Sequence, residues 1–215
     1  MCSSLPPGAP NGLRWIPDLL TPSEASACFA ALLAEVPWED HTFTIFGRTV
    51  PMPRRICMFG SHGYRYSGVC HPPRPLTPTL VGLLQRIEVR TGLAFNSVLC
   101  NLYRGGGDSM GWHTDDDYPH GGQPVIASLS LGATRMFRLR PRRAAGPRRS
   151  VGLPLSSGSL LCMDGAARVD WQHAVPRTRK PVGARINLTF RHMTGGGQGR
   201  VLRCVTEAGG SESGR

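Results

Sequence analysis

The chain has 215 residues and is 40% hydrophobic, which fits one globular domain with a sizeable core. It has no apolar run long enough to cross a bilayer, and its first residues lack the basic and apolar regions of a secretory signal, so we expect an intracellular protein without a membrane partner. Its seven cysteines are odd in number and include no Cys-x-x-Cys pair, which argues against a disulfide framework.

The formal net charge of +11 suits a polyanion such as nucleic acid. A second explanation stays open, because nearly all of this charge is arginine and Lys180 is the only lysine, as in a compositionally biased genome. Charge alone therefore supports a nucleic-acid partner only weakly. We expect a monomer, located in the nucleus if the source is eukaryotic and in the cytoplasm otherwise.

Two helices are predicted in the first half of the chain. Residues 1–12 are rich in Pro, Gly and Ser and are expected to be disordered, and residues 14–20 form a first extended segment. Thr21-Pro22-Ser23-Glu24 has the side chains that cap a helix, and small and apolar residues continue it to residue 35. Thr77-Pro78 opens the second helix, which Gly92 ends.

A hairpin is predicted over Thr42–Ile45 and 48–50, with Phe46-Gly47 at its tip. The turn position predicts that Phe46 is exposed, where a core phenylalanine would not be. We expect Phe43 and Phe59, in contrast, to be core residues.

The hairpin belongs to a segment, residues 38–69, in which aromatic and basic side chains are interleaved. Arginines in this arrangement hold phosphates while the rings offer faces to bases. The arginines are Arg48, Arg54, Arg55 and Arg65, and the tyrosines are Tyr64 and Tyr66.

Many short strands are predicted in the rest of the chain. Residues 95–103 form one of them, on which alternation places Asn101 and Tyr103 on the same face. Glycine-rich turns and inward-facing polar residues indicate a mainly β fold with flanking helices, a distorted double-stranded β-helix of the jelly-roll type. Further strands are expected at 125–131, 134–140, 151–155 and 159–163, with a basic loop at 142–149.

His113 and Asp115 are candidate metal ligands. On an extended segment the period of two places both side chains on one face, where a third ligand from a distant strand completes a three-sided site. His173 is the natural third ligand. Two imidazoles and one carboxylate leave the other positions open, as in the facial triad of non-heme Fe(II) oxygenases, for a cosubstrate and O2. The alternative is chance, because His-x-Asp is a short motif.

Residues 185–191 alternate in the sense opposite to an ordinary surface strand. The polar side chains of Arg185, Asn187 and Arg191 share one face, while Ile186, Leu188 and Phe190 share the other. An apolar reverse face implies packing, so the arginine face is expected to line a cavity, although a solvent-facing edge is the alternative. Two inward arginines require an anion, and a small dicarboxylate satisfies both.

Four motifs occur together in the order of a known family. They are Asn101-Leu102-Tyr103, His113-Thr114-Asp115, His173 and Arg185-x-Asn187-x-Thr189-Phe190-Arg191. With them the chain resembles the AlkB-type Fe(II)- and 2-oxoglutarate-dependent dioxygenases over about residues 14–193. Residues 128–133 and 64–68 are similar to the eukaryotic-type subgroup that acts on 1-methyladenine and 3-methylcytosine.

The resemblance implies a single dioxygenase domain over residues 13–193, with a nucleotide-recognition lid at 38–69 and a disordered tail at 194–215. It implies oxidative demethylation of alkylated bases in single- or double-stranded DNA, in which 2-oxoglutarate becomes succinate and CO2 and the methyl leaves as formaldehyde. Fe(II) would be held by His113, Asp115 and His173. The 2-oxoglutarate would be held by Asn101, Tyr103, Arg185, Asn187 and Arg191, with Arg185 at its distal carboxylate.

The resemblance also implies contacts with the nucleic acid. Phe46 resembles the wedge that fills the gap left by a flipped base in the family's duplex-DNA members. Tyr66 is similar to one wall of the base pocket, opposite His113, and Asp116 to an acceptor for a base amino group. Tyr64 and Arg48 complete the predicted substrate contacts.

Three rival functions stay open at this stage. An RNA demethylase would use the same site. A protein or small-molecule hydroxylase would leave the aromatic and basic segment 38–69 without a purpose. A non-enzymatic binding protein on the same scaffold gives no reason for Arg185 and Arg191 to accompany a complete metal triad.

Overall fold

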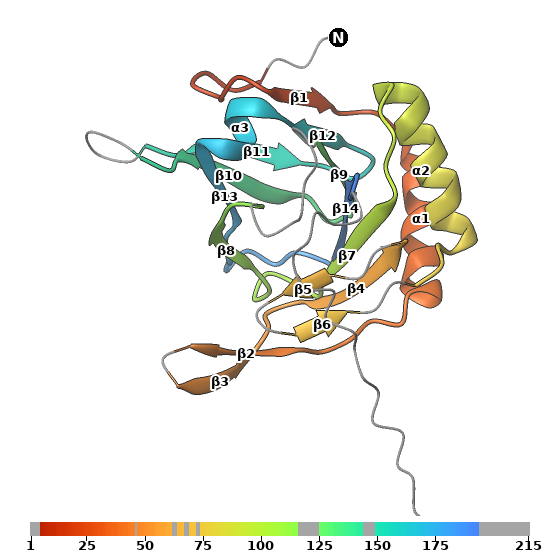
Figure 1. Ribbon diagram of the computed structural model, residues 1–215, viewed down its shortest axis with the longest axis horizontal. Coiled ribbons are helices and arrows are strands. Elements are labelled where there is room, and N and C mark those ends of the chain that lie inside the picture. Colours follow the sequence, from red (N-terminus) through yellow and green to blue (C-terminus); the bar gives the residue numbers. More distant parts are fainter. Residues whose placement is uncertain are drawn as a thin grey trace, which may run out of the picture.

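The computed structural model describes residues 5–45, 47–61, 64–66, 69–71, 74–115, 125–143 and 149–193. Within these ranges two antiparallel sheets form the body of the protein, as Figure 1 shows. The larger sheet has the order β1 (Leu13–Ile16), β12 (Leu160–Met163), β9 (Ile126–Gly132), β14 (Arg185–Arg191), β7 (Ser97–Tyr103) and β4 (Arg55–Gly60). The smaller sheet has the order β11 (Val151–Leu155), β10 (Arg135–Pro141), β13 (Trp171–Val175) and β8 (Met110–His113).

Two long helices cover the outer face of the larger sheet (Figure 1). Both α1 (Pro22–Glu35) and α2 (Pro78–Thr91) begin as predicted, since Thr21 and Thr77 accept hydrogen bonds from the backbone N–H groups of Glu24 and Leu80. In α1, Glu24 bonds back to Thr21 and completes a capping box. Gly92 ends α2 in the left-handed conformation, with a φ of 72°.

The predicted alternation of β14 explains how the two layers are joined. Ile186, Leu188 and Phe190 are fully buried against the helices, in one core with Leu32 of α1 and Leu80 of α2. The opposite face of β14 points between the two sheets, towards a second core made by Phe137, Leu139, Leu153, Leu161 and their neighbours. The strand is therefore buried along its whole length, and the solvent-facing alternative for 185–191 is excluded.

The mainly β, jelly-roll-like fold with flanking helices is thus confirmed, and the strands predicted at 95–103, 125–131, 134–140, 151–155 and 159–163 are present. The first extended segment was predicted over residues 14–20, and the strand found there, β1, is shorter and ends at Ile16. A short helix, α3 (Gly165–Val169), was not predicted, since its five residues are too few to show a helical period.

The predicted lid, residues 38–69, needs one correction. Residues 55–60 form β4, which pairs with β7 along its length and belongs to the larger sheet. Ile56, Cys57, Met58 and Phe59 are all buried, so the strand has no polar face and its sequence shows no alternation. Phe59 is accordingly a core residue, as predicted.

The predicted hairpin is present as β2 (Thr42–Ile45) and β3 (Arg48–Pro51), in which Ile45 lies opposite Arg48. Gly47 has a φ of +74°, which a two-residue hairpin turn demands and which glycine adopts without strain. Arg48 is exposed, and the side chain of Phe43 is outside the described part of the structure.

A second small hairpin consists of β5 (Tyr64–Tyr66) and β6 (Val69–His71). Its backbone places Tyr64 and Tyr66 on one strand, two residues apart; their side chains are not described. Phe46 and Asp116 also lie outside the described residues, as do residues 1–4 and 194–215 of the two ends that were predicted to be disordered. For residues 5–12 the prediction of disorder is wrong: Leu5 packs against the second core, and the carbonyl oxygens of Asn11 and Gly12 accept hydrogen bonds from the backbone N–H groups of Ala167 and Asp164. Among the described helices, none is long and apolar enough to span a lipid bilayer.

Candidate metal centre and anion pocket

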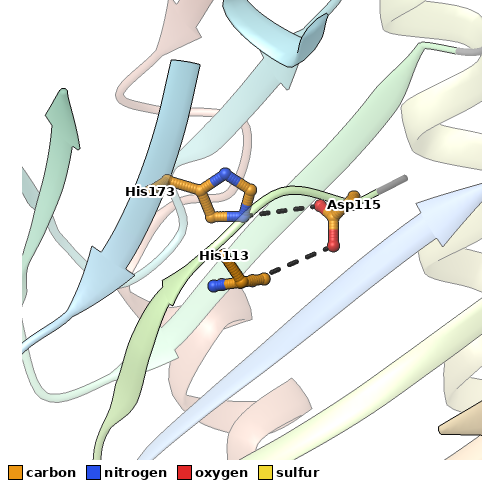
Figure 2. A group of neighbouring side chains, drawn as sticks. All are labelled: His113, Asp115 and His173. Carbon is orange, nitrogen blue, oxygen red and sulfur yellow. Dashed lines mark ion pairs between the residues drawn. The ribbon is translucent and has the colours of Figure 1, made fainter. Parts of the chain in front are cut away.

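Three predicted ligands meet between the two sheets. His173 on β13 lies directly opposite His113 at the end of β8, and Asp115 follows two residues later on the same extended chain. Figure 2 shows both imidazoles directed at the carboxylate, with Nε2 of His173 3.5 Å and Nε2 of His113 3.9 Å from its oxygens. One ligand atom from each residue lies within 4.8 Å of the others, close enough for all three to bind one ion.

The orientation of each imidazole is fixed by a neighbour. Nδ1 of His113 donates to the carbonyl oxygen of Gly111 at 2.8 Å, which leaves Nε2 as the lone-pair nitrogen facing Asp115. The ring of His173 stacks on Phe137, with centroids 5.3 Å apart and an angle of 28° between the planes. The two imidazoles themselves meet edge to face at 4.1 Å.

The charge states of these groups favour metal binding. Burial, followed by the neighbouring His173, lowers the pKa of His113 to about 4, so its ring is neutral near pH 7. Burial by itself raises the pKa of Asp115. The charge of Arg191 and the nearby imidazoles outweigh this effect, and the pKa of Asp115 lies well below its usual range. A neutral imidazole and an ionised carboxylate are the forms that bind a divalent cation.

A cavity of about 330 Å³ opens beside the three ligands. Its wall contains every predicted cosubstrate residue, namely Asn101, Tyr103, Arg185, Asn187 and Arg191. Alternation explains this grouping, because β7 and β14 are neighbours in register, with Asn187 opposite Asn101 and Arg185 opposite Tyr103. Apolar side chains of Leu99, Met110, Phe137, Met163 and Val175 complete the wall.

Arg185 is one of three buried arginines that line this cavity, with Arg54 and Arg191, and only 1% of its surface is exposed. Nη2 donates to Oγ of Ser130 at 2.9 Å, whereas Nε and Nη1 have no hydrogen-bond partner among the described residues. Its guanidinium carbon lies 5.3 Å from the centroid of the Tyr103 ring. Burial lowers the pKa of Arg185, and no described carboxylate compensates its charge, so its position suits an anion from outside the chain.

The amides on the cavity wall are held by their own contacts. Nδ2 of Asn187 donates to Oγ of Ser128 at 2.8 Å and to the carbonyl oxygen of Leu129 at 3.2 Å. Nε of Arg54 donates to Oδ1 of Asn101 at 2.9 Å. The last contact corrects the prediction that Arg54 belongs to a phosphate-binding surface: it is only 3% exposed, because it points into the cavity from the chain just before β4.

Comparison with known proteins identifies the family of this site. Residues 12–191 match the sequence profile of the 2OG-Fe(II) oxygenase superfamily. The chain belongs to this superfamily. The predicted relationship to AlkB-type dioxygenases is confirmed as well: the chain is 40% identical to the alpha-ketoglutarate-dependent dioxygenase alkB homolog 3 of Homo sapiens, over 87% of this chain and 68% of that protein.

Two further relatives agree with this assignment. The DNA oxidative demethylase ALKBH2 of Homo sapiens is 36% identical over 79% of this chain and 69% of its own length. The solved structure of OsALKBH1 superimposes with a TM-score of 0.58, covering 84% of this chain and 98% of that one. Because the identity is only 19%, this likeness concerns the fold alone.

The protein is therefore a 2OG-Fe(II) dioxygenase that uses Fe(II), 2-oxoglutarate and O2, and a function limited to binding is excluded. Its own residues fit these groups. The three clustered ligand residues suit Fe(II), and the two partnerless nitrogens of Arg185 suit one carboxylate of a dicarboxylate.

Beside the oxygenase site lies a buried arginine that sequence reasoning did not single out. Arg135, 3% exposed, donates to the carbonyl oxygens of Gly105 (2.9 Å), Asp108 (2.8 Å) and Pro176 (2.7 Å). It thereby joins the loop before β8 to the chain that leaves β13, the two strands that carry the histidines. Alternation along β10 could have indicated that Arg135 points inwards with Phe137. No pattern in the sequence predicts which carbonyl oxygens it binds.

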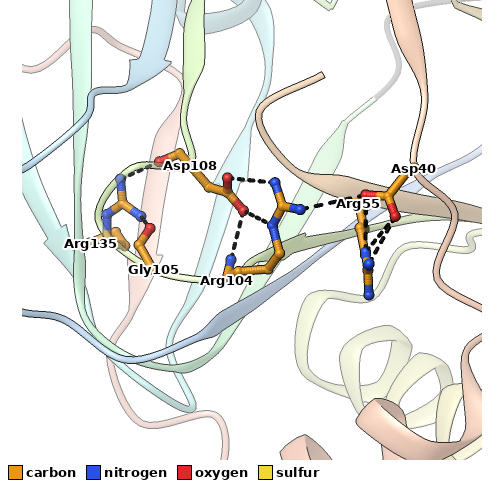
Figure 3. Close-up of polar contacts among 6 residues, drawn as sticks. All are labelled: Asp40, Arg55, Arg104, Gly105, Asp108 and Arg135. Atoms are coloured by element: carbon orange, nitrogen blue, oxygen red, sulfur yellow. Dashed lines mark hydrogen bonds and ion pairs between the residues drawn. The ribbon is translucent and has the colours of Figure 1, made fainter. Parts of the chain in front are cut away.

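A chain of ion pairs continues from this loop, as Figure 3 shows. Arg104 forms two hydrogen bonds from its side chain to Asp108, at 2.8 and 2.9 Å, and reaches Asp40 at 3.5 Å. Asp40 in turn pairs with Arg55 at 2.8 Å. The loop before the metal strand is thus connected to the segment that precedes the hairpin β2–β3.

Proposed function

We propose that this dioxygenase demethylates alkylated nucleobases, in particular 1-methyladenine and 3-methylcytosine in DNA. The observation that carries the proposal is the cavity in which the His113–Asp115–His173 cluster lies beside the partnerless guanidinium of Arg185. The names of the relatives support it, since ALKBH2 is described as a DNA oxidative demethylase. The net charge of +11 agrees with a polyanionic substrate.

Each predicted site residue receives a role in this proposal. His113, Asp115 and His173 hold Fe(II), and Arg185 binds the distal carboxylate of 2-oxoglutarate through its two partnerless nitrogens. Tyr103 packs against that guanidinium and, with Asn101, shapes the distal end of the cosubstrate pocket. Asn187 and Arg191 support the other end of 2-oxoglutarate, the 2-oxo acid end on the iron side. Arg191 acts there through Asp115, which it keeps ionised.

Bound Fe(II) and 2-oxoglutarate, together with O2, would supply the oxidant for the methyl C–H bond: one oxygen atom of O2 ends in succinate as 2-oxoglutarate loses CO2, and the other ends in the hydroxymethyl group. The protein positions the methyl group and excludes water. Leu99, Met163 and Val175 are the apolar part of the wall that does so. The hydroxymethylated base then loses formaldehyde, which leaves the unmodified base.

The substrate base must leave its stack to reach this buried centre. We assign Phe46 at the hairpin tip to filling the vacated space and Tyr66 to one wall of the base pocket. Tyr64 and Arg48 add contacts to the neighbouring nucleotide, and Asp116, which follows the metal ligand Asp115 in the chain, accepts a hydrogen bond from the base amino group. A monomer in the nucleus or cytoplasm is part of the same proposal.

The test is formaldehyde release from oligonucleotides that carry 1-methyladenine or 3-methylcytosine. We expect release that requires Fe(II) and 2-oxoglutarate and that matches succinate formation in amount. Oligonucleotides of the same sequence without the methyl group are the control. Absence of formaldehyde with both lesions, from protein that still decarboxylates 2-oxoglutarate, would reject the nucleobase assignment.

RNA is the competing substrate for the same site. Matched single-stranded DNA, duplex DNA and RNA carrying one lesion in one sequence context separate these possibilities. The DNA assignment requires the highest kcat/KM on one of the two DNA forms, and a higher value on RNA reverses it. Hydroxylation of a peptide without base demethylation would instead support the protein-hydroxylase alternative.

A further inference from the structure

The outer face of the smaller sheet carries a basic and aromatic surface outside the cavity. His113 on β8 and Leu139 on β10 face inwards, so alternation turns Trp112, Arg138 and Arg140 to the other side of the sheet. A second hollow of about 240 Å³ lies there, lined by Trp112, by Arg138 and by Arg177 beyond the end of β13. We call Trp112, Arg138, Arg140 and Arg177 the outer surface.

The positive charge of the outer surface has no acidic partner among the described residues. Nη1 of Arg138 donates to Oγ of Ser150 at 2.9 Å, and Arg140 donates twice to Oε1 of Gln172, at 3.1 and 2.9 Å. Within the described part of the chain, neither residue forms an ion pair, nor does Arg177, and the hollow has no Asp or Glu in its lining. Surface arginines held by neutral acceptors keep their full charge available for an anion.

Trp112 gives this surface a platform for a planar group. It is 36% exposed, and it is one of the large hydrophobic side chains that the described surface presents to solvent. The guanidinium of Arg140 lies 4.2 Å from the centroid of its ring and so holds the indole in place. Arginines around an exposed aromatic ring are the combination by which proteins bind single-stranded nucleic acid without reading its sequence.

The outer surface is separated from the cavity by one strand. Met110 on β8 lines both the cavity and the outer hollow. β8 is the edge strand of its sheet within the described residues, so no further strand lies beyond it. A strand is about 5 Å wide in the plane of the sheet, so a chain that leaves the cavity past this edge and runs to Arg138 on β10 crosses β8 and β13, about 10 Å, and needs more than one nucleotide beyond the target.

We propose that the single-stranded segment next to the target nucleotide passes over the edge of β8 and binds the outer surface. One base stacks on Trp112, and the phosphates on either side of it contact Arg138 and Arg177. This inference rests on the proposed nucleobase function. An acidic protein would also complement the charge, but the exposed indole beside the cavity edge favours a partner with stackable bases.

The experiment compares a long and a short substrate in charge-reversal variants. Arg138→Glu and Arg177→Glu change the outer surface, and Arg90→Glu, on the exposed side of α2, makes the same change in net charge elsewhere. Binding is measured by fluorescence anisotropy with an unmethylated single strand of about 16 nucleotides, the upper end of site sizes in single-strand-binding folds. Turnover is measured with a methylated trinucleotide, which fills the cavity but is too short to follow the outer surface.

We expect each outer-surface variant to bind the long strand about 3- to 10-fold more weakly, with a smaller slope of log K against log salt. Arg90→Glu should bind it nearly as the parent does, and turnover of the trinucleotide should be unchanged in all three variants. Trp112→Ala should weaken binding of the long strand by about 5- to 150-fold, the range of base–aromatic stacking.

Three results would overturn the proposal. If Arg90→Glu weakened binding of the long strand as much as the outer-surface variants do, the effect would be one of net charge only. If the outer-surface variants lost turnover of the trinucleotide by the same factor as binding of the long strand, the substitutions would have distorted the cavity. Polyglutamate that competes with the long strand as well as an unlabelled oligonucleotide does would point to an acidic protein partner. Because the binding measurement needs no demethylation, failure of the demethylase assay with intact binding would reject the proposed function and not the outer surface.

Discussion

Arg191 donates from Nη2 to Oδ1 of Asp115 at 3.0 Å. This bond connects β14, a central strand of the larger sheet, to the carboxylate of the metal centre. Both groups are buried, with 2% and 8% of their residue surfaces exposed. Opposite charges at this distance in a buried site stabilise each other, whereas removal of one leaves the other uncompensated. The pair therefore keeps Asp115 ionised before any metal arrives.

The first prediction concerns this pair. Arg191→Gln should lower the free energy of unfolding of the metal-free protein by about 3 kcal/mol, because the carboxylate loses its counterion. The loss should shrink when Mn(II) is present, since a bound divalent cation then compensates Asp115. Urea unfolding with and without Mn(II) measures both values. Arg90→Gln is the control, and a loss that is the same in both conditions would contradict the explanation.

A second prediction addresses the ligands. His113→Ala should reduce turnover by more than about 100-fold, the upper end seen for residues that merely support metal ligands. The far-ultraviolet circular dichroism should stay that of the parent, because the cavity is open and the two cores do not depend on this ring. His192→Ala, on an exposed side chain near the end of the same domain, is the matched control. Full activity in His113→Ala would remove His113 from the metal centre.

The third prediction concerns the anion pocket. Arg185→Lys keeps the charge but loses the planar fork, and with it the two nitrogens that have no partner within the chain. We expect the KM for 2-oxoglutarate to rise by about 10-fold or more, equivalent to about 1.4 kcal/mol or more of binding. Steady-state decarboxylation kinetics provide the value, with Arg90→Lys as the control. An unchanged KM would show that the cosubstrate binds elsewhere.

The sequence was informative where one chemical pattern determines one local geometry. The alternation along 185–191 predicted the inward arginines correctly, but the same pattern also fits a strand with its polar face in water, and only the position of β14 between two neighbouring strands and under the smaller sheet excludes that alternative. The proximity of His113 and Asp115 was predicted in the same way, because side chains two residues apart on an extended chain point to the same side. His173 followed from chain order in the family, and the register with His113 agrees with it.

The failures have one physical origin, which is contact between segments distant in the chain. Arg54 is next to the half-buried Arg55 in sequence, yet it is itself fully buried, because its partner Asn101 lies 47 residues away on β7. Arg135 is held by carbonyl oxygens of two separate loops, whose convergence no local pattern encodes. β4 was missed as a sheet strand because burial on both faces removes the alternation by which a strand is recognised.

A fourth prediction tests the loop before β8 through pH. Burial raises the pKa of Asp108, but hydrogen bonds and charge from Arg104 lower it more, so the net shift is downward. A carboxylate with a lowered folded-state pKa stabilises the fold above its unfolded pKa of about 4 and loses this effect as the pH falls through the folded value. Arg104 is half-exposed, so we expect a contribution of only about 1 kcal/mol at pH 7.

Asp108→Asn should therefore have a lower Tm than the parent near pH 7, and the difference should narrow as the pH falls below about 4. Thermal unfolding across this range measures it. Asp18→Asn, which changes an exposed carboxylate of the same type, is the control for net charge. A difference that widens in acid would mean that Asp108 acts through something other than its ionised form.

The last prediction separates nucleic-acid handling from the chemistry of the cavity. Phe46 stands between Ile45 and Gly47 in the sequence, at the predicted tip of the hairpin β2–β3, and Arg48 at the start of β3 is exposed. A ring at this position fills the gap only when a base is pulled from a duplex, because a single strand leaves no gap of this kind. Loss of the ring removes about 1 to 3 kcal/mol of stacking, roughly a 5- to 150-fold loss of kcat/KM on duplex DNA.

Phe46→Ala should accordingly impair demethylation of a duplex and spare a single strand of the same sequence. Both substrates are measured at one fixed salt concentration, since arginine contacts make every affinity depend on ionic strength. Arg48→Ala is the matched variant on the other side of the turn: it removes a charge, so we expect it to weaken both substrates and to do so less at high salt. Equal losses of Phe46→Ala on both substrates would make Phe46 a general binding or core residue, and no loss on either would shift the weight to single strands or RNA.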